Sequence, residues 1–212
     1  MRFVWIVADI SVWNHNELRY SIRSVKKFHP DSDVCIVGYK PDWYEGDHIQ
    51  ADDDDTRYRN TYRKAYIACG NFKEWVLMHD DFYLLEPFKK VFCYNGYLKD
   101  RKTSENSRGL VIRDLQERLP DSLDYNQHTP IPVWSATVLK EMPPTGDGFK
   151  QIYCSIETRY DRVVQKDVKI KGRHDPIPKE PFFSTWNNCK HLENQFEKLY
   201  PAPSKHEIDM IG

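Results

Sequence analysis

Three neighbouring residues that could act together on a substrate are His79, Asp80 and Asp81. They follow the apolar run Glu74–Met78, which is typical of a buried strand, and open α/β sheets bind ligands at the carboxyl ends of their strands. Because adjacent carboxylates repel each other, a purely structural role would be costly here. Three interpretations stay open: the pair holds Mg²⁺ or Mn²⁺, Asp80 is a general base for a hydroxyl, or the pair forms a turn.

Two histidines are candidates for the same site. His128 stands in a loop bounded by prolines, and His174 follows a glycine and precedes an Asp-Pro pair. Either one could complete the coordination shell of a metal held by Asp80 and Asp81. The alternative for each is a surface or hydrogen-bonded histidine without a ligand.

Basic residues offer contacts for phosphate. Arg59 and Arg63 are four residues apart and share one face of a predicted helix, where a guanidinium can bind phosphate through two nitrogens. A solvated helix face is the alternative. The acidic run before this helix either favours the helix dipole or faces a ligand through Asp52. Asp9 and Arg19 are expected on the carboxyl edge of the sheet.

The elements that must position these residues alternate between strands and helices. Two apolar strands joined by a helix are most simply parallel. The sequence predicts one α/β domain over residues 1–200, with a mostly parallel sheet between helices, and a loose tail over 201–212. Strands are expected at 3–8, 34–39, 48–51, 74–78 and 168–171, an extended stretch at 128–132, and helices at 14–28, 58–69 with Gly70 as C-cap, 111–119, 135–142, 149–163 and 192–199.

Composition narrows the function classes. The 212 residues carry a net charge of -1, and 14% are aromatic, which argues against a general polyanion binder and against disorder. No apolar run approaches the roughly 20 residues of a membrane span, and residues 1–10 resemble a strand more than a signal peptide. The five cysteines form no C-x-x-C motif, as in a reduced cytoplasmic protein. Phosphate-loop, G-x-G-x-x-G and G-x-S-x-G motifs are missing, which disfavours ATPases, Rossmann dehydrogenases and α/β-hydrolases.

Three segments resemble a known family in the same order. Residues 16–25, NELRYSIRSV, are similar to the "ELRYSLRSI" block of the Stealth sugar-phosphate transferases; Asp80-Asp81-Phe82 and residues 128–142 resemble two later segments of that family. The wider pattern is similar to that of GT-A glycosyltransferases, single α/β domains that bind a nucleotide sugar. The resemblance implies Mn²⁺ or Mg²⁺ on Asp81 with Asp80 beside it, Arg19 near the phosphates and His128 near the reaction centre. Asp9 would replace the N-terminal Asp of the Stealth family.

The resulting hypothesis is metal-assisted transfer of a sugar from a nucleotide sugar, with a UDP-sugar favoured, to a hydroxyl acceptor. Two alternatives stay open: Stealth-like transfer of a sugar phosphate, and a non-catalytic module that binds a glycan or a modified nucleic acid. Each of these hypotheses fits a cytoplasmic protein of a phage or a bacterium that does not contact a membrane. Four aromatic residues either stack on sugar or base faces or close the core: Trp43, Tyr44, Trp134 and Trp186.

Overall fold

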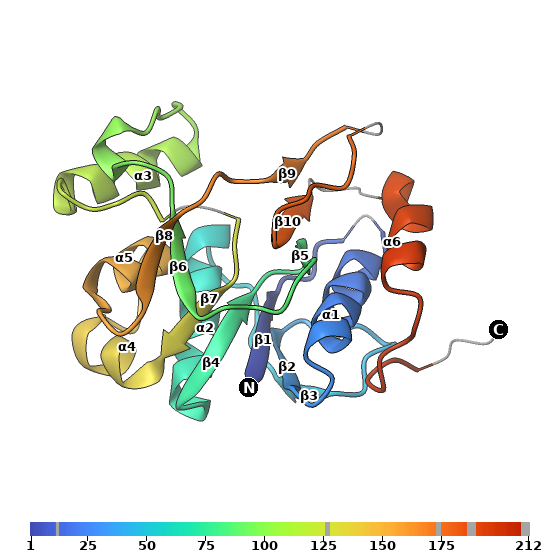
Figure 1. Cartoon of the computed structure of the whole chain (residues 1–212). Helices are drawn as coiled ribbons and strands as arrows, with labels where there is room; N and C mark the ends of the chain where they lie inside the picture. The colour runs from blue at the N-terminus through green and yellow to red at the C-terminus, as the bar shows by residue number, and fades with distance from the viewer. Residues whose placement is uncertain (12, 126–127, 173–174, 186–189, 209–212) are drawn as a thin grey trace.

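The computed structural model describes residues 1–11, 13–125, 128–172, 175–185 and 190–208. Helices flank a central sheet on both faces (Figure 1). The strands are β1 Arg2–Val7, β2 Asp33–Gly38, β3 Asp47–Ile49, β4 Glu74–Met78, β5 Phe82–Leu84, β6 Val91–Tyr94, β7 Ile131–Trp134, β8 Asp161–Val164, β9 Lys169–Ile170 and β10 Phe182–Thr185. The helices are α1 Asn16–Phe28, α2 Arg57–Asn71, α3 Ser107–Arg118, α4 Ser135–Glu141, α5 Phe149–Ile156 and α6 Glu193–Leu199, with short 3₁₀ turns at Leu98–Asp100 and Lys190–Leu192.

The central sheet has the strand order β3-β2-β1-β4-β7. The first four of these strands are parallel to one another, and β7 pairs antiparallel with β4 at the edge. The predicted mostly parallel α/β sheet is therefore confirmed. The chain builds outward from β1 to β2 and β3 and then returns through α2 to β4 on the other side of β1. This reversal leaves a crevice at the carboxyl ends of β1 and β4, where open sheets bind ligands.

Alternation along β1 explains why helices cover both faces. Phe3 and Trp5 pack with the apolar stripe of α1 on one face, whereas Val4 and Ile6 pack with α2, α4 and α5 on the other. Successive side chains of a strand point to opposite faces, so a strand buried on both sides is apolar throughout. The continuous apolar run at the N-terminus is such a strand.

Two predicted helix ends are wrong. The helix expected over 149–163 ends at Ile156, because the buried Glu157 side chain accepts hydrogen bonds from the backbone N–H groups of Thr158 and Arg159 and turns the chain into β8. Gly70 is not the C-cap of α2; the helix continues to Asn71, and Phe72 is the cap. The first error arises because a side-chain hydrogen bond ends the helix there, whereas the apolar periodicity of the sequence continues.

A small second layer covers the carboxyl edge of the main sheet. β5 directly follows Asp81 and pairs antiparallel with β10, which pairs parallel with β9. β6 and β8 form a separate parallel pair. The pattern of apolar residues after Pro87 did not predict β6, β8 or β10. Across the residues described here, the helices lack the length and apolar character needed to span a membrane.

The segment after Tyr200, expected to be loose, is anchored as far as Ile208. Glu207 pairs with Arg23 on α1, and the backbone N–H of Ile208 donates to the carbonyl of Trp43. The last four residues lie outside the described part of the chain. The four described cysteines, Cys35, Cys69, Cys93 and Cys154, are buried free thiols, and Cys189 is not described.

Candidate active site

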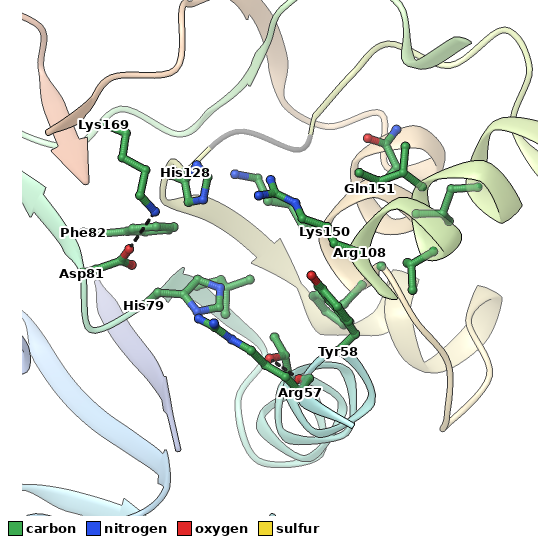
Figure 2. A pocket seen from close by; sticks show the side chains of 17 residues that line it. Arg57, Tyr58, His79, Asp81, Phe82, Arg108, His128, Lys150, Gln151 and Lys169 are labelled. Atoms are coloured by element: carbon green, nitrogen blue, oxygen red, sulfur yellow. Dashed lines mark hydrogen bonds and ion pairs between the residues drawn. The ribbon is translucent and has the colours of Figure 1, made fainter. Parts of the chain in front are cut away.

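A pocket of about 450 Å³ lies at the carboxyl end of β4, beside the point where the strand order reverses (Figure 2). His79, Asp81 and Phe82 form one side, because they directly follow β4. His128 closes the pocket from the loop before β7. Asp81 and His128, two residues predicted from the sequence, therefore line one cavity although 47 positions separate them in the chain.

Four cationic side chains line the same pocket, and they come from four elements. Arg57 is the first residue of α2, Arg108 is the second of α3, Lys150 is the second of α5, and Lys169 begins β9. Figure 2 shows their charged ends pointing toward the middle of the cavity from different sides. Because helix N-termini carry partial positive charge, the three helices add to the positive potential.

Among the described residues that line this pocket, Asp81 is the only one with a carboxylate. Its Oδ2 lies 3.5 Å from the Lys169 ammonium, and 23% of the Asp81 side chain is exposed. Burial raises the pKa of Asp81, while Lys169, His128 and Arg57 oppose that rise. The ion pair with Lys169 thus offsets part of the effect of burial on Asp81.

The two residues before Asp81 are shifted toward their neutral forms. Burial lowers the pKa of His79 to about 3, with nearby Lys150 and Arg57 acting in the same direction. Burial, followed by the charges of Asp81 and Glu17, raises the pKa of Asp80 to about 7. Asp80 is not among the residues that line the pocket.

His128 forms a dyad with Asp167. Its Nδ1 lies 2.8 Å from Asp167 Oδ2, and its backbone N–H donates to Oδ1 at 3.1 Å. Burial raises the pKa of Asp167, but the hydrogen bonds and charge of His128 outweigh burial and hold it below its usual value. A carboxylate accepting from Nδ1 fixes the proton there and leaves the Nε2 lone pair as a base. This arrangement can take a proton from a hydroxyl in the pocket.

Three predicted phosphate contacts have other partners. Arg19 pairs with Glu207 at 3.4 Å and lies over the ring of Trp43. Arg59 lies 3.6 Å from Asp55 and from Asp147, and Arg63 pairs with Asp54 at 2.8 Å. None of the three lines the pocket.

The predicted contacts Asp9 and Asp52 also lie outside the pocket lining and are exposed. The Asp9 backbone N–H donates to Asp53 at 3.4 Å, and Asp52 accepts from the side chain of Gln50. The acidic run is tied to α2 by ion pairs, including one from Asp53 to the buried Lys64 at 2.5 Å. Arg19, Arg59, Arg63 and Asp52 stay sequence predictions for donor binding, and Asp9 stays a sequence prediction for catalysis.

The candidate stacking aromatics differ in burial. Trp43 and Tyr44 are each 1% exposed and pack in the core. Trp134 is half-buried between the side chains of Lys73 and Arg159. Trp186 lies outside the described residues. The aromatic rings that do line the pocket are those of Tyr58, Phe82 and Phe149.

The side chains around Asp81 do not fit a divalent cation. The sequence predicts one on Asp81 and Asp80 with His174, which lies outside the described residues. Within the described ranges, no group of three or more His, Cys, Asp or Glu side chains is arranged to hold a metal ion. The group that meets Asp81 is the Lys169 ammonium, which has no lone pair to offer a metal.

Sequence reasoning missed four residues of this site: Arg108, Lys150, Lys169 and Asp167. Arg108 and Lys150 are single basic residues near a helix start, which are ordinarily solvated, and Asp167 and Lys169 lie in a short charged stretch, 166–171, with no distinctive spacing. Arg57 belongs to the same basic helix as Arg59 and Arg63, but its sequence pattern did not indicate that it lines the pocket. No sequence signal links His128 to Asp167 across 39 positions.

No protein-family model matches the chain, and no curated protein matches its sequence. Among solved structures, it is similar to the galactosyltransferase LgtC in complex with donor and acceptor sugar analogues, at 8% identity, a TM-score of 0.45 and 96% coverage of each chain. An LgtC active-site mutant is similar at 9% identity, with a TM-score of 0.44 and 96% coverage of each chain. The glycosyltransferase GlyE of Streptococcus pneumoniae TIGR4 is similar at 7% identity and a TM-score of 0.35, over 76% of this chain and 44% of that one. These solved structures are glycosyltransferases, the class that the sequence resemblance implied.

Proposed function

We propose that the protein is a glycosyltransferase that moves a sugar from a nucleoside-diphosphate sugar to a hydroxyl acceptor. The observation that carries the proposal is one pocket with two complementary halves. Arg57, Arg108, Lys150 and Lys169 offer positive charge for a diphosphate, and His128 with Asp167 offers a base for a hydroxyl. Glycosyl transfer needs both, because charge develops on the departing diphosphate while the acceptor loses a proton.

In the proposed reaction the acceptor oxygen forms a bond to the anomeric carbon of the donor sugar. The bond between that carbon and the diphosphate oxygen breaks, and its electron pair leaves with the nucleoside diphosphate. The acceptor proton moves to His128 Nε2, while Asp167 holds the ring and stabilises its positive charge. The cationic side chains stabilise the departing diphosphate. Mn²⁺ or Mg²⁺ on Asp81 and Asp80 stays a sequence prediction, and no step depends on it.

The donor class is tested with a panel of UDP-, GDP-, ADP- and CDP-sugars, among which we favour the UDP-sugars. Each donor is offered together with sugar acceptors and with hydroxymethylated DNA. Glycosyl transfer releases the nucleoside diphosphate, which chromatography detects. Binding of a nucleotide sugar without turnover by any acceptor, unchanged in Asp80→Asn and Asp81→Asn, would instead indicate a binding module.

Replacing the base should lower turnover more than donor binding. We expect His128→Ala to reduce kcat roughly 10²–10⁴-fold, the usual contribution of general base catalysis, with little change in the KM of the donor. Asp167→Asn should lower kcat less, because the ring stays but loses its orienting carboxylate. His191→Ala is the matched control, since His191 is exposed and does not line the pocket. Unchanged kcat in His128→Ala would contradict the assignment of the base.

Transfer of a sugar phosphate is the second candidate. It is favoured by the position of the cations, which would stabilise charge on whichever phosphorus is attacked. In that reaction the acceptor oxygen bonds to the distal phosphorus, and a nucleoside monophosphate leaves. Recovery of the monophosphate rather than the diphosphate would decide for this candidate.

A further inference from the structure

The electrostatic balance of the pocket is unusual for a site that is expected to hold a metal ion. Among the described residues, Arg57, Arg108, Lys150 and Lys169 line it together with one carboxylate, Asp81, so positive charges exceed negative ones by three in this part of the chain. That one carboxylate already faces the Lys169 ammonium at 3.5 Å. A divalent cation entering this cavity would meet four like charges, and at separations of a few ångströms such repulsion is substantial in a partly desolvated site.

Neither arginine is in an ion pair with a described residue. Among the described residues no carboxylate pairs with the guanidinium of Arg57 or of Arg108, although ion pairs are frequent elsewhere on α2 and α3. Both residues stand in the first turn of their helices. Lys150 stands in the first turn of α5 and is held by the carbonyl and the hydroxyl of Thr129, each at 2.7 Å. Two of the four cations, Lys150 and Lys169, are held by neighbouring side chains, and all four line a cavity in which positive charge predominates.

We infer that Arg57, Arg108, Lys150 and Lys169 together hold the diphosphate of the donor without a divalent cation. This inference rests on the proposed function and adds the manner in which the donor is bound. Guanidinium groups bind phosphate oxygens through paired hydrogen bonds, and lysines supply compact charge. Asp81 pairs with Lys169 and so competes with the diphosphate for this one charge. The leaving group is stabilised by side chains already in place, so no metal has to bind first.

The first experiment measures binding of pyrophosphate by calorimetry in a buffer that contains EDTA and no metal. We expect binding in EDTA, and a loss of about tenfold in affinity for Arg108→Gln and for Lys169→Gln, because each removes a charge-assisted contact. The matched controls are Arg118→Gln on the same helix as Arg108 and Lys166→Gln near Lys169, since neither residue lines the pocket. Arg57 has an exposed side chain, so Arg57→Gln preserves the test should Lys169→Gln fail to fold.

The second experiment separates cationic binding from metal binding. Asp81→Asn should leave the affinity for pyrophosphate in EDTA unchanged or raise it, because it removes negative charge from an anion site. UDP that binds only with Mn²⁺, and loses this binding in Asp81→Asn, would overturn the inference while leaving glycosyl transfer in place. Absence of binding by UDP, ADP, GDP and CDP with and without Mn²⁺ would overturn both the inference and the proposed function.

Discussion

Lys150 carries its charge in a place where burial works against it. Burial lowers the pKa of Lys150 to about 8, although the thiols of Cys154 and Cys93 and the carboxylates of Asp167 and Asp124 act in the opposite direction. The charged form is the majority below this pKa and is lost as the pH rises through it. A bound anion would favour the charged form again.

This titration predicts a pH dependence of donor binding. Between pH 7 and pH 9 Lys150 loses its proton, so the affinity for UDP should fall several-fold, on the order of one lost charge-assisted contact. The Lys150→Arg variant should keep its affinity for UDP up to a higher pH than the wild type, because a guanidinium stays charged. Calorimetric titrations of both proteins across this range make the comparison, and Lys166→Arg controls for exposed charge. A parallel decline in wild type and Lys150→Arg would show that Lys150 does not contact the anion.

At the scale of elements, the pocket depends on where α5 begins. Gly148 precedes this helix with φ 70°, in the left-handed region that residues with a Cβ disfavour. A Cβ at this position would lie 2.6 Å from Cδ1 of Leu115, which is 2% exposed on α3. The glycine therefore lets α3 and α5 approach each other closely. Both helices carry a pocket cation, so their spacing sets the distance between Arg108 and Lys150.

We expect Gly148→Ala to destabilise the fold by about 1–2 kcal/mol from backbone conformation alone, which corresponds to a decrease in Tm of roughly 2–8 °C for a chain of this size. The matched control is Gly70→Ala, since Gly70 lies inside α2 with open space around it. That substitution should raise stability by about 0.5–1 kcal/mol, because alanine favours helix more than glycine. Thermal unfolding followed by circular dichroism measures both. Equal effects of the two substitutions would disprove the role of Gly148.

At the scale of the whole molecule, the C-terminal segment returns to the first helix. Glu207 accepts hydrogen bonds from Arg23 Nε at 2.9 Å and Nη2 at 2.7 Å, and its side chain is 2% exposed. Arg19 pairs with the same carboxylate at 3.4 Å and also lies 4.7 Å from the ring of Trp43. The cluster joins residues almost 190 positions apart. It explains why Arg19, part of the block that resembles the Stealth family, faces the C-terminal segment and not the pocket.

Breaking this cluster should weaken the whole fold. Glu207→Gln removes the carboxylate that pairs with two partly buried arginines, so we expect a loss of about 3–5 kcal/mol in the free energy of unfolding. Urea unfolding at neutral pH measures it. Asp114→Asn is the control, because Asp114 and Arg118 form an exposed pair on α3, for which about 0.5 kcal/mol or less is expected. A loss for Glu207→Gln as small as that of the control would mean that the C-terminal segment does not stabilise the fold.

The sequence alone determined the elements whose patterns are local. The apolar runs of β1, β2 and β4 and the stripe of α1 are visible in neighbouring residues, because burial on one or both faces fixes the spacing of apolar side chains. It also placed Asp81 at the end of a buried strand and His128 in an extended loop, and both line the pocket. At Glu157 a side-chain hydrogen bond ends the helix, and there the periodicity of apolar residues predicted the wrong boundary.

Only the tertiary structure decided which charges meet. The dyad of His128 and Asp167 joins residues 39 positions apart, and the cations of the pocket come from α2, α3, α5 and β9. Coulomb energy and burial depend on distances in space, and no local pattern encodes the distance between two segments that the fold brings together. Only the structure therefore shows that described cationic side chains surround Asp81, the residue on which the sequence predicted a metal ion.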